Sequence, residues 1–188
     1  MLVIGEPTNR LGVLAERAIG GKGGINKGSM ISVIQELQKL SNPPGIVIAN
    51  MGELYWCPER KKSFTVKNST ALPLPSLAHK GRKYRSSMND IPHNETSEKH
   101  LRYIFQKVLH PLLDSNNKKL SILAIGSSSE VVEKFLDNER NWSNWGERLS
   151  SMVLFGPQCP LESLNNPDLK RFLKKVSQSS NLECQHAI

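Results

Sequence analysis

A segment near the middle of the chain constrains the fold more than any other part of the sequence. Residues 120–136 read LSILAIGSSSEVVEKFL, in which an apolar run ends in one glycine and three serines and an amphipathic helix pattern follows at once. This order predicts a strand, a tight turn and a helix over 130–136. In a nucleophile elbow, a turn with the spacing Gly-x-Ser-x-Gly lifts one serine above a parallel sheet. Gly126 and Ser128 match this spacing, whereas Glu130 stands where the second glycine belongs.

Similar patterns elsewhere predict the remaining strands and helices. Continuous apolar runs indicate three further buried strands, at residues 2–4, 46–49 and 152–155. Apolar residues at helical spacing indicate three further helices, at residues 29–40, 94–109 and 169–176. Alternating strands and helices predict an α/β fold with a doubly wound, mainly parallel sheet, α/β-hydrolase-like but reduced. Ligands of such sheets bind beyond the carboxyl ends of the strands.

The other segments predict one domain with a long irregular insertion. We expect residues 1–176 to form the domain, 51–94 a long basic loop, and 177–188 a polar C-terminal tail. Residues 20–24 are a glycine-rich surface loop in this interpretation, and 141–146 a connecting turn. Pro111 is expected to kink or end the helix that precedes it, because proline lacks the backbone N–H that a helix needs.

The charge of the chain indicates which kinds of partner it favours. The net charge is +8, which favours polyanions or acidic protein faces as partners. The basic residues of the long loop are candidate nucleic-acid contacts: Arg60, Lys61, Lys62, Lys80, Arg82, Lys83 and Arg85. Aromatic residues make up only 6% of the chain and form no RNA-recognition signature, so direct RNA binding is an alternative rather than the favoured function.

Metal, membrane and secretory functions are not indicated. Three scattered cysteines with no Cys-x-x-Cys pair predict neither a zinc site nor a disulfide framework, which fits a reducing compartment. No apolar run is long enough to span a membrane, and the first residues lack the charged leader of a signal peptide. We expect no metal and no cofactor.

The groups that catalysis at Ser128 requires are incomplete. Glu130 brings negative charge to a site where an anionic intermediate would form, and the loop after the first strand begins Glu6-Pro7, in which Pro7 has no N–H to offer. Only His186 follows Ser128 in the chain, and His100 and His110 are expected to face solvent. Serines 127–129 are therefore predicted to cap the helix. We expect the chain to be a pseudo-hydrolase with no catalytic residue. A serine esterase that uses Ser128 remains an alternative.

Several segments together resemble the fungal Argonaute-binding domain family, the second Argonaute-binding subunit of the small-interfering-RNA chaperone complex. The resemblance covers roughly residues 1–157 and rests on the segments 2–4, 11–13, 24–30, 44–50, 54–56, 71–76, 91–94, 100–109 and 124–128 and on Trp142 with Trp145. It implies a non-catalytic subunit, in nucleus and cytoplasm, that acts in RNA interference and heterochromatin silencing. The implied partners are Argonaute and a companion Argonaute-binding subunit, with small RNA bound indirectly or weakly.

Aromatic and proline-rich residues of the long loop are the candidate partner-binding patch: Tyr55, Trp56, Leu72, Pro73, Leu74 and Pro75. Aromatic residues are enriched at protein interfaces, which is why this set is singled out. Two alternatives stay open: these residues fasten the loop to the domain, or the chain is a scaffold for another partner.

Overall fold

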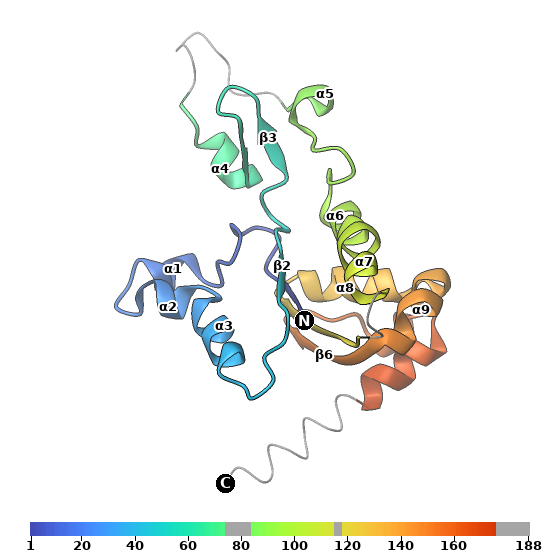
Figure 1. Cartoon of the computed structure of the whole chain (residues 1–188). Coiled ribbons are helices and arrows are strands. Elements are labelled where there is room, and N and C mark those ends of the chain that lie inside the picture. Colours follow the sequence, from blue (N-terminus) through green and yellow to red (C-terminus); the bar gives the residue numbers. More distant parts are fainter. Residues whose placement is uncertain (74–83, 115–117, 176–188) are drawn as a thin grey trace.

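The centre of the molecule is a four-stranded parallel sheet with helices on both faces (Figure 1). The structure is a computed structural model, and it describes residues 1–73, 84–114 and 118–175. The strands are β1 (Leu2–Ile4), β2 (Val47–Ala49), β5 (Leu120–Ile125) and β6 (Leu149–Phe155). Their order is β2-β1-β5-β6, and every neighbouring pair is parallel. The predicted α/β fold, its parallel sheet and its four strands are confirmed.

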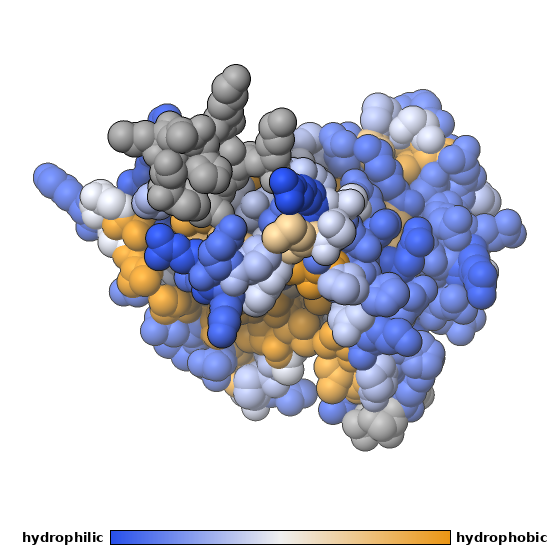
Figure 2. All heavy atoms as spheres, turned by 90° about the horizontal axis from the view of Figure 1, so that it is seen from above, coloured by the Kyte–Doolittle hydropathy of each residue, from blue (hydrophilic) through white to orange (hydrophobic). Residues whose placement is uncertain are grey.

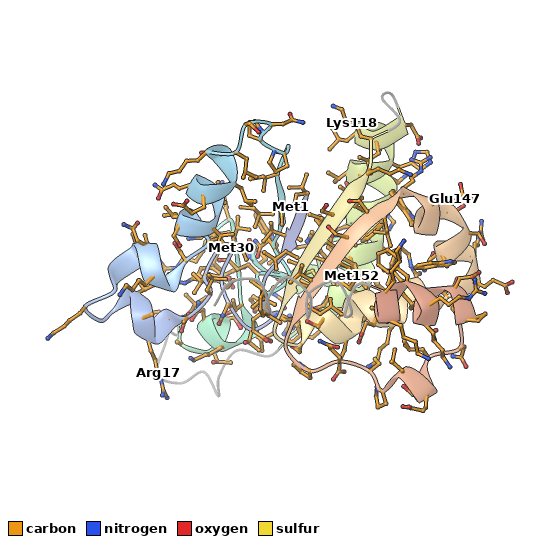
Figure 3. All side chains as sticks on the ribbon, turned by 90° about the horizontal axis from the view of Figure 1, so that it is seen from below. Met1, Arg17, Met30, Lys118, Glu147 and Met152 are labelled. Carbon is orange, nitrogen blue, oxygen red and sulfur yellow. The ribbon has the colours of Figure 1, made fainter. Side chains whose placement is uncertain are left out.

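One face of the sheet is covered by the helices that follow β1, which lie on one side of the strands in Figure 3. These helices are α1 (Glu16–Ile19), α2 (Gly24–Gly28) and α3 (Ile31–Gln38). Val3, Met30 and Leu123 form the buried cluster between this layer and the strands. The predicted helix over 29–40 is present but shorter, and Leu40 lies beyond its end and is 54% exposed. The glycine run that was predicted as a loop contains the start of α2.

The other face carries the larger core. It is covered by α6 (Ser97–Tyr103), the π-helix η1 (Ile104–Leu109), α7 (His110–Asp114), α8 (Ser128–Asp137), α9 (Glu139–Trp145) and the helical residues 167–175. Phe105 is fully buried there, with its ring centroid 4.6 Å from that of Phe135 and 4.9 Å from that of Trp145. The turn predicted for 141–146 is wrong: the Asn138 side chain caps α9, and burial of Trp145 holds the segment as a helix. Two short 3-10 helices, η2 (Gly146–Arg148) and η3 (Leu161–Ser163), flank β6.

Pro111 does not end its helix. Thr96 caps the start through a bond from the Lys99 amide to Thr96 Oγ1, and the helical path continues to Asp114. The irregularity that proline imposes appears in the turn before it, where η1 makes i→i+5 bonds such as that from the His110 N–H to the Phe105 carbonyl. A π-turn of this kind widens the helix without breaking it.

The described parts of the predicted long loop are structured. They contain an antiparallel hairpin of β3 (Tyr55–Cys57) and β4 (Lys62–Phe64), then α4 (Val66–Thr70) and α5 (Ser86–Asn89). This group stands above the sheet in Figure 1, beyond the carboxyl end of β2. The Asn89 side-chain amide donates to the Trp56 carbonyl at 2.9 Å and so fastens α5 to the hairpin. The prediction of an irregular 50–94 segment is therefore wrong for these residues.

The last described helix begins earlier than predicted. Asn166 Oδ1 accepts the amides of Asp168 and Leu169 at 2.9 and 3.1 Å, which starts the helix at residue 167 rather than 169. Residue 176 and the predicted tail 177–188 lie outside the described residues, so the predicted domain boundary stays a prediction. Within the described part of the chain, no helix combines the length and the apolar character needed to cross a bilayer.

Candidate functional site at the carboxyl edge of the sheet and at the hairpin

The loops that follow the four parallel strands meet at one edge of the sheet, as the α/β topology predicts. The loop after β1 touches the loop after β2, where the Leu11 amide donates to Glu53 Oε2 at 3.1 Å. It also touches the turn after β5, through Gly5 and Glu6. The loop after β6 packs on that same turn, because a side chain at Gly156 would collide with the Gly126 backbone. The predicted elbow therefore lies at the centre of this edge.

Gly126 forms the turn of the elbow. Its φ is +69°, a left-handed conformation that glycine adopts freely, and its amide donates to the Phe155 carbonyl at 2.6 Å. A Cβ at this position would collide with the Glu6 carboxylate. The elbow is thus closed on its outer side by an acidic residue from another loop.

The Glu6 carboxylate occupies the amino end of α8. Its Oε2 accepts the Ser127 amide at 2.9 Å, and its Oε1 accepts the Ser127 hydroxyl at 2.7 Å. An anion at a helix N-terminus satisfies free N–H groups and interacts favourably with the helix dipole. The prediction that the serine side chains cap this helix is therefore wrong for Ser127, because its hydroxyl is a donor to the acceptor that Glu6 supplies.

Ser128, the residue placed at the elbow by the sequence pattern, is fully buried inside the first turn of α8. Its hydroxyl donates to the Gly5 carbonyl at 2.6 Å. Ser129 is buried as well, so Ser127 is the exposed serine of the three. The Glu130 carboxylate, which was expected to crowd the elbow, pairs instead with Lys134 at 3.3 Å along the helix. The acid that fills the elbow is Glu6.

Two of the described histidines, His100 and His110, are bonded away from the elbow. His110 is exposed, as predicted, and its Nδ1 lies 2.6 Å from Asp114 Oδ2. The prediction for His100 is wrong: its ring is half-buried, its Nδ1 lies 2.6 Å from Asn94 Oδ1, and its Nε2 is buried without a partner among the described residues. Burial lowers the pKa of His100, which keeps the ring neutral. His79 and His186 lie outside the described residues.

Next to the elbow lies a buried acid that the sequence analysis missed. Glu133 falls on the apolar face of α8 and is 1% exposed, and its Oε2 accepts the Cys159 amide at 2.6 Å. Burial raises the pKa of Glu133, and the Cys159 bond only partly offsets this. Burial, together with the neighbouring carboxylate, also raises the pKa of the Cys159 thiol. The sequence signal was an acidic residue that directly follows Val132 and lies one helical turn before Leu136, which by itself is typical of a surface position.

The residues of the predicted partner-binding patch do not share one surface. Tyr55 and Trp56 are successive residues of β3, so their side chains leave opposite faces of the hairpin. Tyr55 lines an apolar hollow of about 320 Å³ together with Leu54, Val66 and Tyr84, and we call this the hairpin hollow. Asp90 and Glu95 also line it. The sequence analysis missed Val66 and Tyr84, although they are 72% and 59% exposed.

The rest of the predicted patch is only partly described. Trp56 is 36% exposed, Leu72 is half-buried and Pro73 is exposed, while Leu74 and Pro75 lie outside the described residues. Figure 2, which looks down on this end of the molecule, shows hydrophobic side chains exposed among hydrophilic ones.

Only some residues of the predicted basic clusters belong to the described part of the chain. Arg60 and Lys61 lie in the turn of the hairpin and Lys62 begins β4, all three exposed. The Lys62 ammonium lies 5.8 Å from the centre of the Phe64 ring. Arg85, also exposed, immediately precedes α5. Lys80, Arg82 and Lys83 lie outside the described residues.

Comparison with known proteins decides the family. Residues 1–179 match the model of the Arb2 domain. The chain belongs to the Arb2 domain family. This is the Argonaute-binding protein 2 family, which is involved in RNA interference and heterochromatin and whose suggested partner is Argonaute. No curated protein and no solved structure matches the chain. Among the described residues of this Arb2 domain, no group of histidines, cysteines and acids is arranged to hold a metal ion.

The bonds of Glu6 predict a graded loss of stability in this Arb2 domain. Glu6→Ala removes both acceptors of Ser127 and should lower the free energy of unfolding by about 1–2 kcal/mol, the usual cost of a lost helix cap. Glu6→Gln keeps one acceptor and loses the charge, so about 0.5 kcal/mol is expected. Urea unfolding followed by circular dichroism measures both. The control is Glu36→Gln, which breaks an exposed pair with Lys39 and should cost under about 0.5 kcal/mol. A Glu6→Ala variant as stable as the control would contradict this role.

Glu133 predicts a pH dependence with a definite sign. Its pKa is raised in the folded protein, so its contribution to stability is fully present below the pKa of the unfolded chain and is lost as pH rises through the folded value. Glu133→Gln removes this titration while keeping an oxygen that accepts the Cys159 amide. The variant should therefore gain stability relative to the wild type as the pH rises above about 4.5, as measured by urea unfolding at several pH values. A difference between the two proteins that does not change with pH would contradict the assignment.

Proposed function

We propose that this Arb2 domain is a non-catalytic subunit of an Argonaute small-interfering-RNA chaperone complex. It acts by protein–protein interaction in RNA interference and heterochromatin silencing, in nucleus and cytoplasm, with Argonaute and a companion Argonaute-binding subunit as partners. Membership of the Arb2 family supports the partner. The observation that carries the non-catalytic part is the closed elbow, where Ser128 is buried and the Glu6 carboxylate holds the amino end of α8.

The electrostatics of the elbow support this function over the esterase alternative. An acyl-transfer enzyme needs free N–H groups aimed at the oxygen that becomes negative. Here the Ser127 amide is already bonded to a carboxylate, which would also repel a second anion at the same place. No described histidine is bonded to the Ser127 or Ser128 hydroxyl, so the described residues supply no serine–histidine pair for nucleophilic catalysis.

The hairpin hollow is our candidate for the Argonaute-facing surface. Val66 and Tyr84 are large apolar residues left mostly exposed, and Tyr55 lies between them and the body of the hairpin, 6.3 Å from Tyr84 between ring centroids. Apolar and aromatic side chains that remain exposed around a hollow are the usual anchors of a protein interface. The candidate surface therefore includes Tyr55 of the predicted partner-binding patch, together with Val66 and Tyr84.

The non-catalytic assignment predicts that no serine reacts with an activated phosphonate. After incubation with a fluorophosphonate probe, intact mass spectrometry should show no adduct, because Ser128 is buried and the Ser127 hydroxyl is bonded to Glu6. A serine esterase in the same tube serves as the positive control. Stoichiometric labelling of either serine in the folded protein would refute the assignment.

The docking assignment predicts a local effect of charge in the hairpin hollow. Val66→Glu places a carboxylate at a position that is 72% exposed, so the fold should be unaffected, while recovery of Argonaute with the tagged protein from cells should fall at least tenfold. The matched control is Ile25→Glu on α2, which is 57% exposed and distant in sequence from the hairpin. Equal recovery with Val66→Glu and the wild type would exclude this hollow as the interface, and failure of the wild type to recover Argonaute would exclude the partner.

A further inference from the structure

The outer face of α6 and η1 carries positive charge around a second hollow. Lys99, Arg102, Tyr103, Gln106 and Lys107 line a depression of about 370 Å³, closed at one end by His93 and Glu95. Arg102, Gln106 and Lys107 are exposed, and Tyr103 is 37% exposed although it is aromatic. We call this set of residues the α6 stripe. It belongs to neither the closed elbow nor the predicted basic clusters.

The π-turn contributes to the shape of the stripe. In an α-helix, residues five apart point about 140° away from each other, so Arg102 and Lys107 would diverge. The i→i+5 bonds of η1 add a residue to the turn and bring Lys107 closer to the line of Arg102. Both side chains therefore reach the same hollow. Long π segments are rare and occur frequently at functional sites.

The stripe has an excess of positive charge. Its one acid, Glu95, is paired with Lys99, with 3.4 Å between Oε2 and Nζ. Arg102 and Lys107 form no ion pair with any acid in the part of the chain that the structure describes. Around it, the α6–α9 side of the molecule presents a mainly hydrophilic surface in Figure 2. Two cations flanking an aromatic ring are thus available to a ligand.

We propose that the α6 stripe is a binding site for single-stranded nucleic acid. Arg102 and Lys107 contact phosphates, Lys99 adds long-range attraction, and Tyr103 offers its ring for a base to stack on. From Lys99 to Lys107 the helix rises by at most about 12 Å, the length of about three stacked nucleotides at about 3.4 Å each. An acidic protein segment would use the cations but gain nothing from an exposed ring between them, which is why nucleic acid is favoured.

The test measures binding of a fluorescein-labelled 15-nucleotide oligouridine by fluorescence anisotropy at several salt concentrations. The stripe variant is K99Q/R102Q/K107Q. The control, R17Q/K22Q/K27Q, removes the same charge from exposed residues of α1, α2 and the turn between them. Tyr103→Ala and Tyr103→Phe test stacking separately from charge. Circular dichroism and thermal melting confirm that each variant is folded.

The stripe variant should bind at least tenfold more weakly than the control. Its slope of log affinity against log salt should be smaller by about 1.4, since each of the two lost phosphate contacts contributes about 0.7 for single strands. Tyr103→Ala should weaken binding about fivefold or more at every salt concentration, whereas Tyr103→Phe should bind as the wild type does.

Equal losses in the two triple variants, an unaffected Tyr103→Ala, or stronger binding of polyglutamate than of oligouridine would each overturn the proposal. Absence of wild-type binding at 50 mM salt would do so as well. Recovery of Argonaute by the stripe variant is a separate readout, so this proposal can fail while the docking function stands.

Discussion

The contact on which the functional edge depends is the pair of hydrogen bonds from Ser127 to the Glu6 carboxylate. Because β1 and β5 are neighbouring parallel strands, the loops that follow them are forced together, and a carboxylate from one loop meets the amino end of the helix in the other. Gly126 leaves the space in which this carboxylate lies. Glycine at the elbow is thus explained by packing against Glu6, with no need for a nucleophile at the apex.

In this arrangement a turn has the shape of a nucleophile elbow while its serines make structural hydrogen bonds. Strand, glycine turn and helix follow from the parallel sheet, which needs a short connection from β5 into α8. Catalysis needs more: an exposed hydroxyl, a base and an unoccupied set of amide donors. In this Arb2 domain the Ser128 hydroxyl is bonded to the Gly5 carbonyl, and the Ser127 amide is bonded to an acid. The bonds that stabilise this edge therefore engage the hydroxyl and the amide that acyl transfer would need free.

The strands that consist of continuous apolar runs could be predicted from the sequence. The helices and buried residues that depend on contacts between distant parts of the chain could not. The four strands were predictable because each contains a continuous apolar run, although β6 lies at the edge of the sheet and leaves Val153 and Phe155 exposed. Helix α9 was missed because its cap, Asn138, and its buried Trp145 read as turn residues in a polar segment. The hairpin was missed because each of its strands has only three residues, which are too few to show an alternating pattern of apolar and polar side chains. The burial of Glu133 and His100 depends on loops that fold over them, which no local pattern records.

The two surfaces proposed for partners are adjacent. Glu95, just before α6, lines both the hairpin hollow and the α6 stripe, so the apolar surface and the cationic surface meet at this residue. One partner that carries both an apolar anchor and a nucleic-acid strand could then contact both surfaces at once. Two adjoining weak sites act on one ligand with a high effective concentration, so neither needs to bind tightly alone. A strand bound at the stripe would also place negative charge near Glu95, and the pairing of Glu95 with Lys99 reduces the repulsion between the two.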